Sequence, residues 1–267
     1  MKVVEGSFPG GEPYLQVGTG RPLVYLSGFS TEHANPTSFG RWLTLSTVRP
    51  FARAGFQVYF TGRAPHLAPT TTYGDLAASL ADGVGAHFDE PVDMLGHSTG
   101  GSLLLQILAD RAEVVRRAVV ASAAYKLGPV AKKAQLDLLH SLETDGRFRA
   151  DELAAGFTQN PVMQRVLSIP MRLASLVKVH NPADPIAVLR AEDQFDVYDR
   201  LPAISTETLV ICGARDYFWT PAMFEETAQR LPHGELIMYP KGGHSIVTSK
   251  RFVADVVAFL SRSGGPR

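Results

Sequence analysis

One serine of the sequence lies in a setting that suits a nucleophile. Ser98 is the centre of Gly96-His97-Ser98-Thr99-Gly100, a Gly-x-Ser-x-Gly pattern. Residues 92–95 before it are typical of a strand, and residues 101–111 after it have the apolar spacing of a helix. On such a turn the hydroxyl stands above the sheet edge, and the glycines leave room for neighbouring backbone. The pattern predicts attack of Ser98 on a carbonyl carbon; a plain turn with a serine helix cap is the alternative.

A serine hydroxyl is a weak nucleophile unless a base accepts its proton. His244 suits this role because its glycine-flanked loop, Lys241-Gly242-Gly243-His244, follows the last predicted strand and precedes the final helix. Such a loop can place the imidazole over the sheet edge. The other histidines are interpreted as packing or surface residues: His33, His66, His87, His97, His140, His180 and His233.

A carboxylate is needed to orient the histidine and to stabilise its charged form. Asp216 follows the predicted strand 209–211, and chemistry collects at the carboxyl ends of strands in open α/β sheets. Asp196 and Asp199 are weaker candidates because both precede that strand. A loop or helix-capping role for Asp216 is the alternative.

The elements that must position these residues alternate along the chain. Short apolar runs separated by helical patterns favour a parallel sheet flanked by helices. Residues 3–6 and 14–17, broken by Pro9-Gly10-Gly11, predict an antiparallel hairpin at one edge. Further strands are predicted at 23–26, 57–60, 92–95, 118–121, 209–211 and 235–239, and helices at 76–88, 101–111, 221–231 and 252–260. Residues 30–50 are interpreted as a solvated loop, from which Glu32 and His33 could line the site.

One stretch breaks the alternation. Between Tyr125 and Ala203 we find helical patterns, at 135–142, 152–157 and 163–179, but no good strand. The strands resume at Thr208, which favours an insertion over a separate domain. We therefore expect a core of residues 1–124 and 204–267 and a helical cap of residues 125–203.

Four segments together resemble the α/β-hydrolase superfamily over nearly the whole chain. They are Leu26-Ser27-Gly28-Phe29, Gly96 to Gly100, Gly213-Ala214-Arg215-Asp216 and Gly242-Gly243-His244, with serine, acid and histidine in that family's order. The resemblance implies an α/β fold with an eight-stranded, mostly parallel sheet, flanking helices and a helical cap insertion. It also implies that Ser98, Asp216 and His244 form a catalytic triad.

Two backbone N–H groups are candidates for an oxyanion hole. Thr99 begins the helix after Ser98, where N–H groups stabilise an anion. By the resemblance, the second donor falls on Phe29, although Ser27-Gly28 replaces the family's usual histidine-glycine pair. Thr61-Gly62 likewise replaces the Pro-Asp pair that many relatives carry, which puts the contacts of that loop in doubt but leaves the triad intact.

We expect a serine hydrolase that cleaves a small, modestly hydrophobic ester or related acyl bond through an acyl-enzyme on Ser98. Within the family, serine at this position favours esters, thioesters, lactones, amides or activated ketones. Alternatives are another reaction of the same triad, such as C–C bond hydrolysis, acyl transfer, perhydrolysis or a lyase reaction, and a ligand-binding protein with little turnover. Pocket candidates, which could instead be core residues, are Tyr125, Phe157, Met163, Leu167, Met171, Phe218 and Trp219.

The composition limits which kinds of binding partner are expected. The chain has 26 basic and 26 acidic residues, so its zero net charge gives no long-range attraction to nucleic acid or an anionic membrane. We expect a small-molecule substrate and no metal or organic cofactor, since metal-binding and phosphate-loop motifs are missing. Cys212, the single cysteine, is interpreted as a small core residue. A cytoplasmic location is expected from the lack of a signal-like or spanning apolar run, and the oligomeric state stays open.

Overall fold

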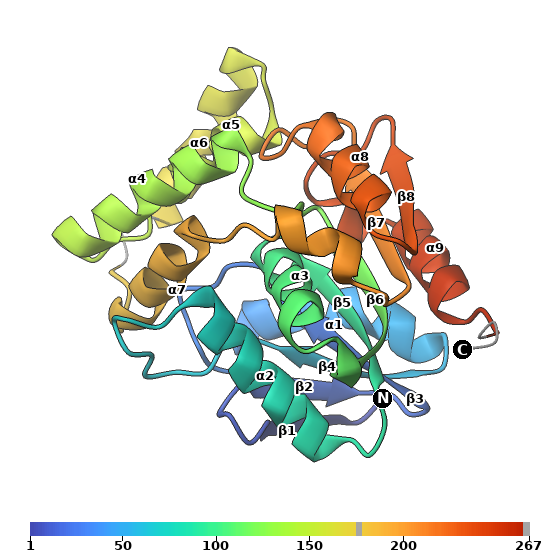
Figure 1. The fold of residues 1–267 in the computed structure, drawn as a ribbon. Helices are drawn as coiled ribbons and strands as arrows, with labels where there is room; N and C mark the ends of the chain where they lie inside the picture. Colours follow the sequence, from blue (N-terminus) through green and yellow to red (C-terminus); the bar gives the residue numbers. More distant parts are fainter. Residues whose placement is uncertain (175–177, 264–267) are drawn as a thin grey trace.

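An eight-stranded sheet forms the centre of the protein in the computed structural model, which describes residues 1–174 and 178–263 (Figure 1). The strand order is β1-β2-β4-β3-β5-β6-β7-β8. β1 and β2 pair antiparallel, β2 pairs antiparallel with β4, and the remaining pairs are parallel. The strands are β1 (Val3–Ser7), β2 (Pro13–Val17), β3 (Arg21–Leu26), β4 (Phe56–Thr61), β5 (Val92–His97), β6 (Val115–Ala121), β7 (Thr208–Gly213) and β8 (Gly234–Tyr239). The predicted fold class and edge hairpin are confirmed.

Helices cover both faces of the sheet. One face packs against α2 (Tyr73–His87), α3 (Thr99–Asp110) and α8 (Pro221–Arg230), and the other against α1 (Ser38–Arg53) and α9 (Lys250–Leu260). Because side chains alternate along a strand, Met94 and Val210 face the first group while Leu95 and Ile211 face the second. Burial on both faces explains why the central strands are continuous apolar runs.

A helical segment, residues 125–203, lies between β6 and β7. It contains α4 (Pro129–Asp145), α5 (Ala154–Phe157), α6 (Pro161–Ala174), α7 (Ala183–Asp193) and two 3₁₀ turns, η2 (Ala150–Leu153) and η3 (Tyr198–Ala203). Its helices α4, α5 and α6 extend to one side of the main body, whereas η3 packs against α3 (Figure 1). Shorter 3₁₀ turns, η1 (Ala112–Val114) and η4 (Ile246–Thr248), precede β6 and α9.

Two parts of the secondary structure differ from the sequence prediction. The expected loop at 30–50 is wrong from Ser38 onward, because α1 begins there and buries Leu45, Val48 and Phe51 at helical spacing. The helix predicted at 163–179 ends at Ala174; residues 175–177 of that prediction lie outside the described residues. α7 was not predicted at all.

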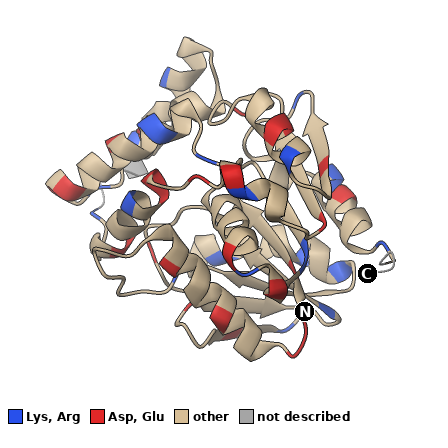
Figure 2. Cartoon of the chain, viewed as in Figure 1, with Lys and Arg blue, Asp and Glu red and all other residues tan. Residues whose placement is uncertain are grey.

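The charged residues are mixed in sign. Figure 2 shows acidic and basic residues interspersed over the same helices and strands in this view. Within the described ranges, 1–174 and 178–263, no helix is both long enough and apolar enough to cross a membrane.

Candidate active site

Ser98 occupies a strained turn between β5 and α3. Its backbone has φ +56° and ψ −126°, a conformation that L-residues adopt only where the surrounding structure enforces it. A Cβ on Gly96 would collide with the carbonyl oxygen of Gly100, and one on Gly100 with that of Leu26. The glycines therefore allow β3, β5 and α3 to meet closely enough to hold the turn.

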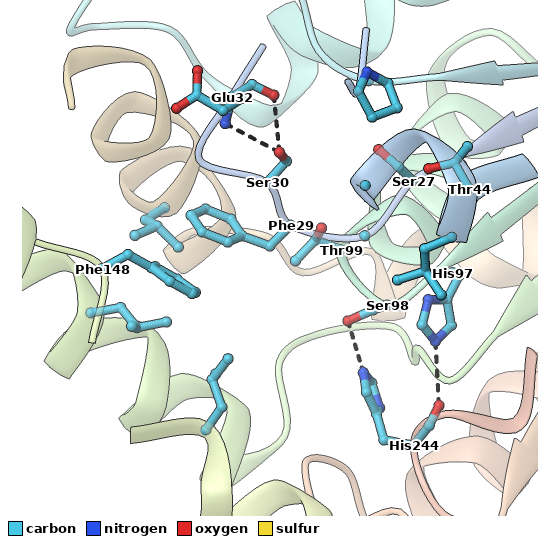
Figure 3. A pocket seen from close by; sticks show the side chains of 18 of the residues that line it. Ser27, Phe29, Ser30, Glu32, Thr44, His97, Ser98, Thr99, Phe148 and His244 are labelled. Carbon is cyan, nitrogen blue, oxygen red and sulfur yellow. Dashed lines mark hydrogen bonds between the residues drawn. The ribbon is translucent and has the colours of Figure 1, made fainter. Parts of the chain in front are cut away.

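The side chain of Ser98 does not cap α3; it points to His244 (Figure 3). The Ser98 hydroxyl lies 3.1 Å from Nε2 of His244, and Nδ1 of the same ring lies 2.8 Å from Oδ2 of Asp216. Because a carboxylate only accepts hydrogen bonds, Nδ1 carries the proton and Nε2 presents its lone pair to the serine. Asp216 is 1% exposed and His244 is 8% exposed. The structure thus brings the three predicted residues together in one hydrogen-bonded chain.

The acid loop and the histidine loop are joined through their backbones. The N–H of Arg215 donates to the carbonyl of Gly242 at 2.8 Å, and a Cβ on Gly213 would collide with that same carbonyl. The second oxygen of Asp216 accepts the N–H of Phe218 at 3.1 Å. These contacts orient the carboxylate toward the imidazole.

The carbonyl of His244 has two donors of its own. The Ser122 hydroxyl donates to it at 3.0 Å, and Nε2–H of His97 donates at 3.3 Å (Figure 3). Burial, followed by the nearby His244 ring, lowers the pKa of His97 to about 3. His97 therefore stays neutral near pH 7 and acts as a hydrogen-bond donor, while the proton-accepting nitrogen that faces Ser98 belongs to His244.

Three aromatic rings surround the imidazole of His244. Trp219 stacks on it with ring centres 5.8 Å apart, Phe218 lies 4.6 Å away, and Phe157 of α5 meets it edge-on at 5.9 Å. These rings pack around the imidazole and limit its rotation.

The backbone N–H groups of Phe29 and Thr99, the residues that the sequence analysis singles out, donate to no acceptor among the described residues. A Cβ on Gly28 would lie 3.5 Å from Cβ of Ser98, so the loop carrying Phe29 runs directly beside the serine. The carbonyl of Ser98 is already held by the N–H groups of Gly101 and Ser102, which leaves the Thr99 N–H turned toward the hydroxyl side.

A cavity of about 930 Å³ opens over Ser98. Of the pocket residues expected from the sequence, Phe157, Phe218 and Trp219 line it. Tyr125, Met163, Leu167 and Met171 do not line it. Tyr125 is buried and donates its hydroxyl to Glu226 at 2.9 Å, and α6, which carries the other three, exposes apolar side chains at its surface, including 45% of Met163.

Sequence reasoning missed most of the cavity wall. On one side lie residues of the helical segment: Leu127, Ala131, Gln135, Leu138, Phe148, Leu153 and Leu189. On the other side α1 contributes Gly40, Leu43 and Thr44. Phe148 stacks on Phe29 with ring centres 5.5 Å apart (Figure 3). The helical spacing of Ala131, Gln135 and Leu138 was the available signal.

Glu32 and His33, which the sequence analysis offered as site residues, lie in different surroundings. Glu32 lies at the rim of the cavity, whereas His33 is buried and its Nδ1–H donates to the carbonyl of Ala64 at 2.8 Å.

Cys212 is buried in β7, and burial raises the pKa of its thiol well above the usual range. In the part of the chain that the structure describes, no group of three or more His, Cys, Asp or Glu side chains could hold a metal ion.

Comparisons with known proteins place this chain in a family. The family model described as "Alpha/beta hydrolase family" matches residues 23–256. A protein of Yersinia enterocolitica named as a carbamate hydrolase is 26% identical over 220 residues, which cover 79% of this chain and 78% of that protein. The pimeloyl-[acyl-carrier protein] methyl ester esterase of Neisseria meningitidis is 27% identical over 197 residues, covering 69% and 72%.

Solved structures of other proteins share the fold. A thermophilic esterase from Thermogutta terrifontis superposes with a TM-score of 0.71 at 19% identity, over 97% of this chain and 98% of that one. Since the family model spans most of the sequence and the sheet carries that family's order of strands and helices, the chain belongs to the alpha/beta hydrolase family, and the protein is an enzyme.

Proposed function

We propose that the enzyme is a serine hydrolase that cleaves a small, modestly hydrophobic ester or related acyl bond through an acyl-enzyme on Ser98. The observation that carries the proposal is the chain of hydrogen bonds from Ser98 through His244 to Asp216 at the base of the cavity. Serine, imidazole and carboxylate in this order act as nucleophile, base and orienting group.

The reaction proceeds in two halves. In the first, Nε2 of His244 takes the hydroxyl proton as Ser98 attacks the carbonyl carbon, and the protonated ring then gives that proton to the leaving alcohol. In the second, water loses a proton to the same nitrogen as it attacks the acyl-enzyme, and the acid leaves with the Ser98 hydroxyl restored. The carboxylate of Asp216 holds the ring in place and stabilises the imidazolium.

The unpaired N–H groups of Phe29 and Thr99 serve as the oxyanion hole in this proposal. Each donor aimed at the developing negative charge contributes about 3 kcal/mol to lowering the barrier. The apolar wall of the cavity supports an uncharged acyl or alcohol group, and the mixed surface charge supports a substrate without strong charge. The substrates named for the two relatives are carbonyl compounds with a heteroatom leaving group, which this mechanism accommodates.

Turnover of p-nitrophenyl esters tests the proposal. Ser98→Ala and His244→Ala should each lower kcat by at least about 10³-fold, and the double variant should lose little more, because residues that act as a unit are non-additive. A fluorophosphonate probe should label the wild type at Ser98 and leave Ser98→Ala unlabelled.

Ser46→Ala is the matched control, since Ser46 is an exposed serine of α1 whose hydroxyl donates to the carbonyl of Leu43. It should be labelled and should turn over esters as the wild type does. A folded wild-type protein that neither reacts with the probe nor hydrolyses any ester of the panel would contradict a nucleophilic serine.

A further inference from the structure

A buried arginine lies behind the candidate oxyanion hole. Arg63 follows β4 and is 5% exposed. Its Nη1 donates to the carbonyls of Ser27 at 2.7 Å and Gly28 at 2.8 Å, and its Nη2 donates to the Thr99 hydroxyl at 2.9 Å. One guanidinium therefore bridges the loop after β3 and the first residue of α3.

The bond to Gly28 acts on the peptide that carries the Phe29 N–H. A trans peptide is planar, so its C=O and N–H point in opposite directions. Holding the Gly28 oxygen on the guanidinium sets the direction of the Phe29 N–H on the other side of the plane. A positive charge at the oxygen also polarises the amide, which makes that N–H a stronger donor.

Thr99 is restrained from two sides. Arg63 holds its hydroxyl, and the phenol of Tyr73 on α2 donates to its carbonyl at 2.8 Å. Two points of attachment on one residue leave the Thr99 N–H little freedom to turn. The guanidinium of Arg63 thus connects the two residues whose N–H groups would face the reacting carbonyl.

The partners of Arg63 distinguish it from an arginine that serves stability alone. Across the described ranges, it has no carboxylate within ion-pair distance, and its three hydrogen bonds go to oxygens of the site. Arg117 offers the comparison: it is 3% exposed, pairs with Glu207, and donates to backbone carbonyls near the end of α9.

We propose that Arg63 is a positioning residue that aims the Phe29 and Thr99 N–H groups at one oxyanion. This inference rests on the proposed function. It predicts that removing the guanidinium weakens the binding of a tetrahedral oxyanion much more than the binding of a neutral ground-state ligand.

The test compares two inhibitors of the same shape. An alkyl trifluoromethyl ketone forms a tetrahedral oxyanion when Ser98 adds to it, whereas the matching secondary alcohol cannot accept the serine. Arg63→Met should raise the Ki of the ketone by 10- to 100-fold and change that of the alcohol by less than twofold. For p-nitrophenyl esters, kcat should fall by a similar factor with KM nearly unchanged, and Arg63→Lys should recover part of the loss.

Arg117→Met is the control: it should lower the melting temperature but leave the ratio of the two Ki values as in the wild type. Thr99→Val removes the hydrogen bond from Nη2 of Arg63 and keeps a side chain of nearly the same shape. It should raise the Ki of the ketone several-fold. This variant tests the proposal even if Arg63→Met does not fold. Equal weakening of ketone and alcohol, or no change in either, would overturn the role of Arg63. A wild-type protein that neither forms the ketone adduct nor hydrolyses esters would instead contradict the proposed function.

Discussion

Two neighbouring histidines at the site differ in what they can do with a proton. The rings of His97 and His244 lie 5.2 Å apart. His97 is held neutral by burial and gives its one N–H to a backbone carbonyl, so it supports the loop. His244 has a carboxylate on one nitrogen and a hydroxyl on the other, which is the arrangement of a general base.

The charge of the Asp216 side chain can be tested without changing the size of the side chain. Asp216→Asn should fold normally and lower kcat by about 10³- to 10⁴-fold, because an amide can donate to Nδ1 and stabilise the wrong tautomer of His244. Steady-state turnover and a thermal melt measure the two effects. Asp199→Asn, at an exposed residue of η3, should leave turnover unchanged. Wild-type activity in Asp216→Asn would mean that another carboxylate orients the histidine.

The positions of the three candidate catalytic residues were easier to predict than the residues around them. Ser98, Asp216 and His244 each follow a strand closely, and the ends of parallel strands meet at one sheet edge whatever the details of packing. The pocket candidates on α6 had no such anchor. Helical spacing marks a face of a helix but does not tell whether that face meets solvent, core or cavity, so Met163 and Leu167 were placed in a pocket that α4 and α7 line instead.

At the scale of elements, α7 carries a carboxyl group into the core behind the site. Glu192 is fully buried, and the Tyr73 hydroxyl lies 3.4 Å from it. Burial raises the pKa of Glu192 to about 7, although the positive charge of Arg63 acts in the opposite direction. A helix of the segment 125–203 is thereby linked electrostatically to the loop after β4.

This link predicts a pH-dependent stability. The pKa of Glu192 in the folded protein lies above its ordinary value of 4.5, so the favourable contribution is complete below about pH 4.5 and is lost as pH rises through 7. Glu192→Gln carries no such loss. Its free energy of unfolding relative to the wild type should therefore rise between pH 5 and pH 8, by about 3 kcal/mol at most.

Urea unfolding of both proteins at the two pH values measures that difference, and the comparison cancels the titration of all other groups. Asp193→Asn, the neighbouring acid of α7, is the control because its carboxylate pairs with exposed Lys132. A difference between Glu192→Gln and wild type that is the same at both pH values would contradict a buried, mostly protonated Glu192.

The helices that sequence analysis missed share a physical cause. α1 begins with exposed Phe39 and Trp42 and a polar approach, so its buried stripe starts only at Leu45. α7 has Pro182 just before it and Pro185 in its first turn, residues that usually mark loops. In both cases the helix is stabilised by tertiary packing, of α1 against the sheet and of α7 against α4, and the local sequence carries no clear helix signal.

At the scale of the whole molecule, the cavity lies between two parts of the chain that are distant in sequence. α1 and the loop before it form one wall, and α4, α5 and α7 form the other, with Ser98 at the base. The parallel sheet and its flanking helices could be predicted because strand and helix patterns alternate regularly. The shape of the cavity could not, because it depends on how the segment 125–203 lies against that sheet.

The wall formed by α4 should set the longest acyl chain that fits. Ala131→Phe places a ring in the cavity, so kcat/KM for p-nitrophenyl octanoate should fall at least about tenfold relative to p-nitrophenyl acetate. Leu136→Phe on the same helix is the control, since Leu136 is 45% exposed and does not line the cavity. Equal losses on both esters in Ala131→Phe would argue that acyl chains bind elsewhere.

The loop that carries Asp216 donates hydrogen bonds to the helical segment at separate places. The N–H of Tyr217 donates to the carbonyl of Gly156 at 3.2 Å, and the indole N–H of Trp219 donates to the carbonyl of Lys126 at 2.8 Å. A foreign set of helices grafted between β6 and β7 would therefore have to reproduce both acceptors to keep the acid in register. Recombination therefore cannot exchange the segment 125–203 freely. A change of these helices that reshapes the cavity also changes the contacts that hold the loop of Asp216.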